Sequence, residues 1–143
     1  MPNWTSNTLH VTGMPDAVDK FVEHMGEEMD FRKIIPPPEN LFTGALGGKE
    51  RKMCEEKGIP NWYDWQRENW GTKWNATNEG PVEIKVYSET TKEATYVFNT
   101  AWDTPQEVIR ALWDNWPELD FEGGYIHEGY EGCGNFQEFN NRE

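Results

Sequence analysis

Apolar and polar positions in the first part of the chain predict a strand followed by a helix. Residues 8–12 alternate between apolar and polar and stop at Gly13, as expected of a half-buried strand. After Pro15 the apolar residues recur at helical spacing, which predicts an amphipathic helix that ends near Asp30. Its expected buried stripe is Val18, Phe21, Val22, Met25 and Met29.

The next segment predicts an insertion. Residues 31–35 have an extended pattern, which the three following prolines end because they supply no donors to a sheet. From about 39 to 69 the chain is rich in glycine, charge and aromatic residues, and it is too long for a plain connection. One short helix is expected over residues 49–57, ended by Gly58. A second is expected across Trp62, Trp65 and Asn69.

A hairpin and a second long helix follow. Residues 81–87 and 94–100 both read as strands, and the polar turn between them favours direct pairing. The residues expected on one face of the first of these strands are Val82, Ile84 and Val86. Thr104, Pro105 and Glu107 have the spacing of a capping box and predict a helix start. Its buried stripe is Val108, Ile109, Leu112, Trp113 and Trp116, and Pro117 ends it.

The order of these elements predicts the fold class. Residues 119–122 and 125–127 indicate a last strand, bulged at the two glycines between them. The result is an α+β, ferredoxin-like β-α-β-β-α-β sandwich, in which two helices cover one face of an antiparallel sheet. The 143 residues suit a single domain, with an aromatic-rich insertion after the first helix and an acidic, glycine-rich tail over about 128–143.

Four separate motifs carry a resemblance to a known family. They are NW at 3–4 with NxLxVxG at 7–13, IIPxPE at 34–39, NWGTKWN at 69–75, and FxTAWxxP at 98–105. Together they resemble the YubB ferredoxin-like domain family of phages and conjugative plasmids, from Asn3 to about Tyr125. The chain departs from that family at Thr5, where many members carry cysteine, and in the tail from Glu128, which lacks a clear aromatic ending.

The resemblance implies an accessory protein of a mobile genetic element, located in the cytoplasm of a bacterial host. It brings no reaction and no catalytic residues. "Ferredoxin-like" describes topology here, because an iron–sulfur cluster needs four thiolates and the chain has only Cys54 and Cys133. No cofactor is therefore expected, and both cysteines are expected to be reduced thiols.

Four of the eight tryptophans lie between residues 61 and 76. Trp70 and Trp74 are expected to cover the sheet as scaffold. The neighbouring aromatics Trp62, Tyr63 and Trp65 lie on the insertion and are predicted to form a partner-binding surface. An alternative is a small-ligand or nucleotide pocket, or an enzyme site, between the insertion and the sheet. It would be built from Trp62, Trp65, Trp70 and Lys73.

The net charge is −13 and is concentrated at the two ends. Residues 1–30 carry six acids against one lysine, a net of −5, and residues 114–143 carry eight acids against one arginine, a net of −7. The middle of the chain therefore sums to −1. Such a field repels phosphate backbones and argues against direct nucleic-acid binding.

The charge pattern predicts one merged acidic surface made by the first helix and the C-terminal segment. Its expected residues are Glu23, Glu27, Glu28, Glu122 and Glu131. The expected partner is a host protein with a basic groove, and the specific version is an inhibitor of a host defence or nucleic-acid-binding factor. The simpler reading is that these acids are solvated faces that keep the protein soluble.

Little in the sequence points to catalysis. His127, Glu128 and Cys133 form the one group that combines a nucleophile with a base. Acids near Asp120 could ligate a divalent ion but lack the fixed spacing of a calcium loop. No apolar run is long enough to cross a membrane. We therefore expect a non-enzymatic interaction protein with no catalytic, metal or cofactor residues, and the sequence leaves its oligomeric state open.

Overall fold

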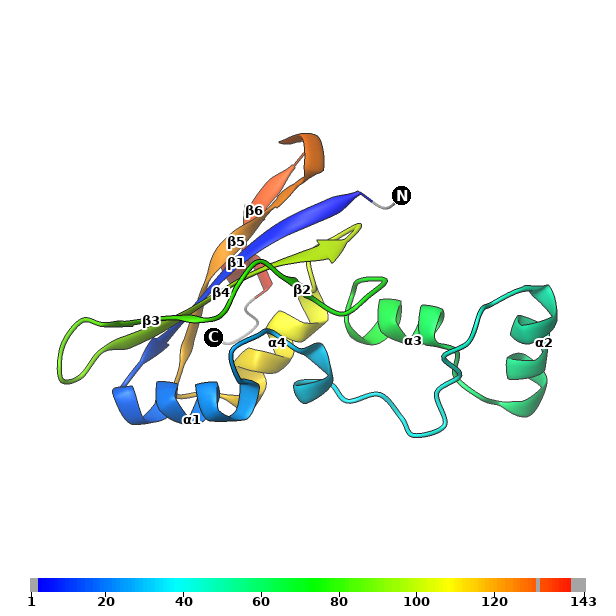
Figure 1. Ribbon diagram of the computed structural model, residues 1–143, viewed down its shortest axis with the longest axis horizontal. Coiled ribbons are helices and arrows are strands. Elements are labelled where there is room, and N and C mark those ends of the chain that lie inside the picture. Colours follow the sequence, from blue (N-terminus) through cyan, green and yellow to red (C-terminus); the bar gives the residue numbers. More distant parts are fainter. Residues whose placement is uncertain (1–2, 131, 140–143) are drawn as a thin grey trace.

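The computed structural model describes residues 3–130 and 132–139. Within them six strands form one sheet, and two helices pack on one of its faces (Figure 1). The strands are β1 (Trp4–Gly13), β2 (Thr77–Asn78), β3 (Glu83–Val86), β4 (Lys92–Ala101), β5 (Asp120–His127) and β6 (Cys133–Asn135). The α-helices are α1 (Pro15–Met25), α2 (Gly48–Lys57), α3 (Trp62–Asn69) and α4 (Gln106–Asn115). The 3-10 turns are η1 (Phe31–Lys33), η2 (Glu128–Tyr130) and η3 (Phe136–Phe139).

The predicted fold class is confirmed. The sheet is antiparallel, with the order β2–β4–β1–β5–β6, and β3 also pairs with β4. Without the short β2 and β6, the order β3–β4–β1–β5 with α1 and α4 on one face is that of a ferredoxin-like sandwich. Both short helices predicted in the insertion are present as α2 and α3, and Figure 1 shows them projecting away from the sheet.

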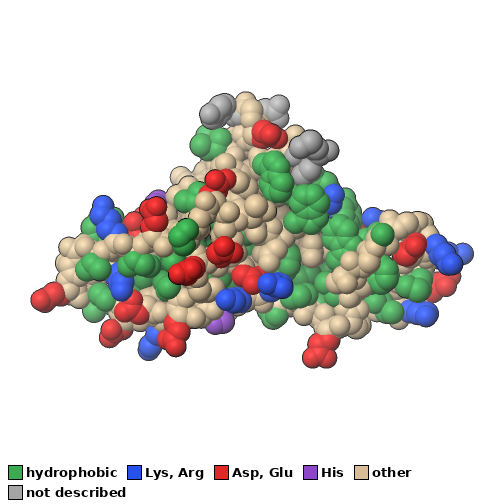
Figure 2. Space-filling model, viewed as in Figure 1, with side chains coloured by type: hydrophobic (Ala, Val, Ile, Leu, Met, Phe, Trp, Pro, Cys, Tyr) green, Lys and Arg blue, Asp and Glu red, His purple; other side chains and the backbone are tan. Residues whose placement is uncertain are grey.

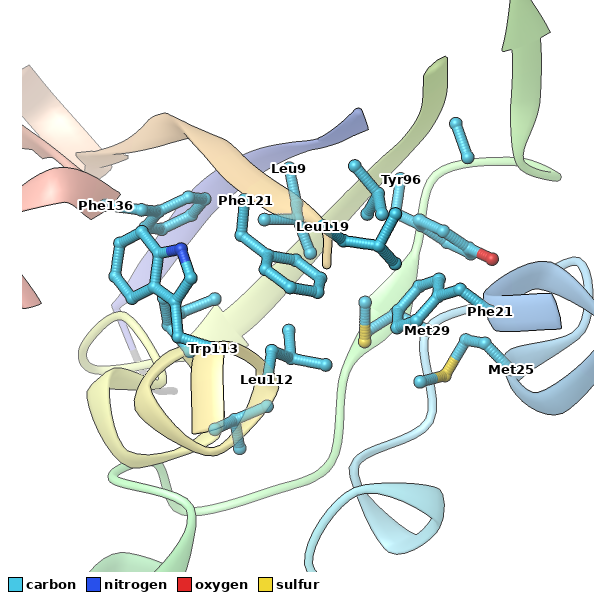
Figure 3. Packing of buried hydrophobic residues seen from close by; sticks show 14 of the residues in the cluster. Leu9, Phe21, Met25, Met29, Tyr96, Leu112, Trp113, Leu119, Phe121 and Phe136 are labelled. Atoms are coloured by element: carbon cyan, nitrogen blue, oxygen red, sulfur yellow. The ribbon is translucent and has the colours of Figure 1, made fainter. Parts of the chain in front are cut away.

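The core between the sheet and α1 and α4 is rich in aromatic rings (Figure 3). Phe21 of α1 meets Tyr96 and Phe121 edge to face, at 6.1 and 5.6 Å between ring centroids. Such pairs add about 0.5–1.5 kcal/mol each beyond the burial of their surface. α4 buries the predicted stripe except for Trp116, which is half-buried.

The tail, whose fold the sequence leaves open, folds back on the sheet. β6 pairs with β5, and η3 buries Phe136 and Phe139. In Figure 3 Phe136 lies beside Trp113 of α4. The rings of Tyr125 and Phe139 stack at 6.0 Å. These two buried phenylalanines, rather than the strand ending at residue 127, complete the core at this end.

Several predicted boundaries were wrong because contacts distant in sequence override local pattern. β1 begins at Trp4 rather than at residue 8, since Thr5 and Asn7 are buried polar residues that break the apolar alternation. α1 ends at Met25, where Gly26 takes a φ of 88°. Residues 31–33 form η1 instead of extended chain.

The predicted capping box is absent. α4 begins at Gln106, and its N-cap residue Pro105 has no side chain that could cap. The Thr104 hydroxyl instead donates to Asn7 Oδ1 at 2.8 Å, and Glu107 pairs with Arg110 at 2.7 Å. The predicted helix is present, but it begins at Gln106, one residue after the proline that was expected at its first position.

The predicted bulge in the last strand is also absent. β5 pairs with β1 in one unbroken register from Asp120 to His127. The two glycines are needed because the neighbouring strands β1 and β6 come too close to β5 at these positions for a side chain to fit. A Cβ at Gly123 would lie 2.0 Å from the Thr8 carbonyl oxygen, and one at Gly124 would lie 2.4 Å from that of Gly134.

Side chains of two asparagines, one before β2 and one in it, form hydrogen bonds with the turn after α1. Asn78 accepts from the Met29 amide at 2.8 Å and donates to the Met29 carbonyl at 3.0 Å. Asn75 accepts from the Phe31 amide at 2.9 Å and donates to Asp30 Oδ1 at 2.9 Å. This explains structurally why the 69–75 motif ends in asparagine.

Asp30 should make stability depend on pH. Hydrogen bonds from Arg32, and then from Asn75, lower the pKa of Asp30 from 3.8 to about 2. A lowered folded-state pKa stabilises the protein above the unfolded value, and this contribution is lost as pH falls through about 2. Asp30→Asn should lower the free energy of unfolding at pH 7 by about 1 kcal/mol, since solvent screens the exposed Arg32.

Urea unfolding of both proteins at pH 7, 4 and 2 measures this. The difference between them should shrink toward zero at the lowest pH. The matched control is Asp114→Asn on α4, an exposed residue whose substitution should have a small effect at every pH. If wild type were more stable than Asp30→Asn by the same free energy at pH 2 as at pH 7, the lowered pKa of Asp30 would be contradicted.

Candidate binding site at the tip of the sheet

The chain makes an unusual turn where β4 ends. Trp102 has a φ of 75° and is the one residue other than glycine with positive φ in the described ranges 3–130 and 132–139. The Asp103 amide donates to the Ala101 carbonyl at 3.0 Å, so Trp102 is the central residue of a γ-turn. This conformation is strained for a bulky side chain and persists only when the surrounding structure holds it.

A buried polar cluster holds that turn. Asn7, on β1, donates to Thr100 Oγ1 at 3.0 Å and accepts from the Thr104 hydroxyl at 2.8 Å. The Thr100 hydroxyl donates in turn to the Asp103 carbonyl. All three side chains are buried, so these bonds satisfy groups that would otherwise be costly to bury. The cluster fixes the γ-turn, and 40% of the Trp102 surface remains exposed.

Two adjoining hollows lie at this tip, where β1 begins and β4 and β5 end. The tip cavity has a volume of about 340 Å³ and is lined by Asn3, Trp4, Trp102, Asp103, His127 and Glu128. The face cavity, of about 450 Å³, is lined by Trp4, Ser6, Glu79, Asn99, Ile126, His127, Glu128 and Gly129. Trp4, His127 and Glu128 line both. The linings contain three carboxylates and no lysine or arginine.

The face cavity opens onto the uncovered face, by which we mean the sheet face opposite α1 and α4. Near the tip this face carries two exposed apolar side chains, Val97 at 39% and Ile126 at 46%, beside the polar Ser6 and Asn99. Farther along it is acidic. Strand register places its charged and titratable side chains in two rows, Glu122–His10–Thr95–Glu83 and Asp120–Thr12–Glu93–Lys85. Four carboxylates thus face one lysine there.

A row of alternating rings and cations joins the insertion to the tip. Tyr63 of α3 lies between Arg51 and Arg67, each 5.2 Å from its ring centroid. The row continues through Trp102, Lys73 and Trp74 to Trp4. Figure 2 shows hydrophobic side chains gathered with lysine and arginine between the sheet and α3. Each cation–π contact contributes about 0.5–1 kcal/mol, so the row anchors the insertion.

The family model for the ferredoxin-like domain in Api92-like proteins matches residues 69–143, just over half of the chain. The chain belongs to this family. The match spans the Trp102 turn, β3 and the whole of β5. No curated protein and no solved structure matches the chain.

In this Api92-like domain, the predicted aromatic surface is already engaged. Trp65 meets Trp70 at 5.4 Å edge to face and packs against the core. Trp62 donates from Nε1 to the Gly44 carbonyl at 2.9 Å and holds the loop before α2. Tyr63 is enclosed by the cation–π row. These rings therefore support the insertion, and that the three residues also bind a partner stays a prediction.

The structure brings together only part of the group predicted for the alternative pocket between insertion and sheet. Trp65 and Trp70 contact each other edge to face at 5.4 Å between ring centroids. Lys73 lies instead over Trp74 at 4.6 Å and Trp102 at 5.0 Å. Trp70 is scaffold as predicted, whereas Trp74 lies in irregular chain before β2 and contacts Trp4.

The predicted acidic residues do not form one surface. Glu23 is exposed on α1, and Glu27 and Glu28 are exposed in the turn after it, beside the segment that leads into β3. Glu122 lies on the uncovered face of β5, opposite His10. Because β1 and β4 separate β5 from that edge, and α1 covers the other face, the two groups point away from each other. Glu131 lies outside the described residues.

The side chain of His127 contacts two residues of the fold, Thr5 and Asp103. Its Nδ1 lies 2.8 Å from the Thr5 hydroxyl and its Nε2 lies 3.8 Å from Asp103. A hydroxyl, imidazole and carboxylate in that order resemble a nucleophilic triad, but Thr5 is fully buried and unreachable by substrate. Cys133 is exposed on β6, and the contacts of the His127 ring nitrogens are with Thr5 and Asp103. In the described part of the chain no His, Cys, Asp and Glu group could hold a metal ion.

No helix within the described ranges has the length and apolar character needed to cross a bilayer.

Sequence reasoning missed the residues that shape the tip. Trp102 stands directly after a strand and two residues before the helix-opening Thr104-Pro105 pair, which is an unusual place for a tryptophan. That position was the available signal. Its positive φ, and the neighbouring hollows, depend on strand pairing that pattern alone does not reveal.

Proposed function

We propose that this protein is a non-enzymatic interaction protein that binds a basic segment of a partner protein at the tip and uncovered face of its sheet. The observation that carries the proposal is the lining of the two hollows, which combines Trp4 and Trp102 with Glu79, Asp103 and Glu128 and includes no lysine or arginine. Carboxylates attract guanidinium and ammonium ions, and the indoles add aromatic surface beside them. Arg67 and Lys73 already make cation–π contacts with Trp102, so the carboxylates are the main attraction for a partner's cations.

The uncovered face supports an extended partner rather than a lone side chain. Val97 and Ile126 offer apolar contact next to the hollows, and the acidic rows follow farther along the strands. A segment that alternates basic with apolar residues would match both parts. This partner chemistry agrees with the expectation of a basic groove, but it relocates the contact from Glu23, Glu27 and Glu28 to the tip.

The biological setting is also a proposal. The motifs shared with the YubB family support an accessory role for a phage or plasmid, in the cytoplasm of a bacterial host. We propose that the target is a host protein, and that the specific function is inhibition of a defence or nucleic-acid-binding factor through its basic groove. An acidic protein of this charge would compete with nucleic acid for such a groove.

A small cationic ligand is the second candidate. The tip cavity lies at the small end of the range for ligand pockets, and its carboxylates disfavour the phosphates of a nucleotide. Thermal-shift measurements with small amines and with nucleotides separate the candidates. A ligand at one hundred times its dissociation constant adds about 2.7 kcal/mol of stability. A shift with an amine would favour this candidate over the partner protein.

Removing the tip carboxylates should weaken binding of a basic peptide about tenfold. The double variant Asp103→Asn with Glu128→Gln keeps the acceptor oxygens for the Thr104 and Trp4 amides but removes both charges. Fluorescence anisotropy with a labelled oligoarginine peptide measures the change, with an oligoglutamate peptide as the negative probe. Binding should also weaken with added salt.

The matched control removes the same charge elsewhere. Glu55→Gln with Glu56→Gln on α2 alters two exposed carboxylates away from the tip and should leave the affinity within about twofold. Equal losses in both double variants would show that net charge alone attracts the peptide, and the proposed site would be abandoned.

A further inference from the structure

The β3 strand forms an open edge of the sheet. It pairs with β4 on one side, and in the described part of the chain no strand lies on its other side. All four of its residues are exposed, including Ile84 at 46% and Val86 at 66%. A flat edge strand with exposed apolar residues is a template for pairing with another strand.

The outward main-chain groups of β3 can be assigned from its neighbours. The Tyr87 amide donates to the Thr91 carbonyl inside the hairpin, so it points toward β4. Because main-chain groups alternate along a strand, those of Ile84 and Val86 point away from β4. The Val82 amide also points away from β4, and it is bonded to the Glu27 carbonyl at 2.7 Å. Ile84 therefore lies at the centre of the open edge.

The residues around Ile84 are self-complementary. The sequence from 82 to 86 is Val-Glu-Ile-Lys-Val, which is symmetric in character about its centre. Alternation places Glu83 and Lys85 on the uncovered face, and Val82, Ile84 and Val86 on the face that carries the helices. Among the described residues neither Glu83 nor Lys85 forms an ion pair, although Lys85 lies 4.9 Å from the Tyr87 ring centroid.

We propose that β3 pairs antiparallel with β3 of a second copy of this chain, about a two-fold axis at Ile84. In this register Glu83 of each copy faces Lys85 of the other and Ile84 faces Ile84. The Glu27 carbonyl, which is bonded to the Val82 amide, ends the pairing on that side. The two Ile84 residues exchange a pair of main-chain hydrogen bonds. The two sheets become one continuous sheet, and the uncovered faces of both copies lie on the same side.

Charge selects this register over its neighbours. A pairing centred on Glu83 would place the two Glu83 carboxylates opposite each other, and one centred on Lys85 would oppose the two lysines. Shifts by a single residue would place the outward main-chain groups of Ile84 opposite a residue whose own groups point toward β4, so the hydrogen bonds could not form. Opposite charges in direct cross-strand pairs are stabilising and like charges are destabilising, so the Ile84-centred register is favoured on both counts.

The interface is small and should be weak, with a dissociation constant on the order of 100 µM. Sedimentation velocity of the wild-type chain from roughly 10 µM to 1 mM should show a concentration-dependent monomer–dimer equilibrium. Glu83→Lys places two lysines opposite each other twice in the dimer, and Lys85→Glu does the same with two carboxylates. Each single variant should raise the dissociation constant about tenfold or more.

Mixing the two variants gives the deciding measurement. In a heterodimer of Glu83→Lys with Lys85→Glu every facing pair is again of opposite charge. The mixture should dimerise about as well as wild type, and native mass spectrometry should find the mixed species. The matched control is Glu89→Lys in the hairpin turn, which makes the same charge change without a facing partner and should leave the dissociation constant unchanged.

A wild-type chain that stays monomeric over the whole range would overturn the proposal. So would a mixture that dimerises no better than either variant alone. Circular dichroism and thermal melts of each variant establish that it is folded, and exposed substitutions on β3 should keep the fold because they bury nothing. This experiment uses the chain alone, so its outcome is independent of whether the tip binds a basic partner.

Discussion

Replacing Trp70 by alanine should lower the free energy of unfolding by about 4 kcal/mol. Trp70 is only 2% exposed, and its ring meets Phe31 at 5.7 Å and Trp65 at 5.4 Å between centroids. Its Nε1 donates to the Ile35 carbonyl at 2.9 Å, which would be left without that donor. Urea unfolding followed by far-ultraviolet circular dichroism measures the loss without relying on tryptophan fluorescence.

Trp62→Ala is the matched control for Trp70→Ala. Trp62 is half-buried, begins the α3 helix that ends just before Trp70, and makes one hydrogen bond to the loop at Gly44. Its replacement should cost about 1 kcal/mol and leave the sheet intact. If both variants lost a similar amount of free energy of unfolding, the distinction between a buried core Trp70 and a half-buried Trp62 would be contradicted.

The tryptophan-rich segment shows where local pattern succeeds and where it fails. The α3 helix was predicted correctly because the three-residue spacing of Trp62 and Trp65 is a local signal, and in the structure the Asn61 side chain caps it. Trp65, which was expected on a surface, is half-buried against the core because Trp70, five residues later, contacts it. Spacing places Trp62 and Trp65 near one another on α3, but it does not reveal which of them the core will cover.

The candidate site failed to appear in the sequence for a related reason. Alternation around Phe121 correctly indicates that Glu122 points away from the core, but strand order decides what lies beside it. Residues far apart in the chain become neighbours only through the β1 pairings with β4 and β5. The buried polar cluster at Asn7 also reads as surface, since polar residues at alternating positions look like the solvent side of a strand.

The two proposals use different parts of one sheet: the tip binds a partner, and the β3 edge pairs with a second copy. The γ-turn at Trp102 is held by buried bonds, so the indole is presented without reorganisation on binding. At the opposite edge β3 contributes almost nothing to the core, because all its residues are exposed. Its apolar side chains are therefore better explained by pairing than by folding.

Gly123→Ala should be the most damaging single methyl group that can be added to the chain. Gly123 has a φ of 115°, and an alanine Cβ there would lie 2.0 Å from the Thr8 carbonyl oxygen. Relief requires β1 and β5 to separate, and these strands pair along eight residues in the centre of the sheet. We expect a loss of at least about 4 kcal/mol in the free energy of unfolding, or a protein that fails to fold.

Two further alanine substitutions turn this into a graded test. Gly124→Ala meets the Gly134 carbonyl at 2.4 Å, but it disturbs only the pairing of β5 with the three-residue β6, so its loss should be smaller. Gly48→Ala at the start of α2 meets no atom within 4 Å and should stabilise the helix by up to about 1 kcal/mol. Circular dichroism melts should rank the three variants in that order. If Gly123→Ala melted with wild type, the close approach of β1 to β5, and with it the strand register that positions His127 and Glu128 at the tip, would be refuted.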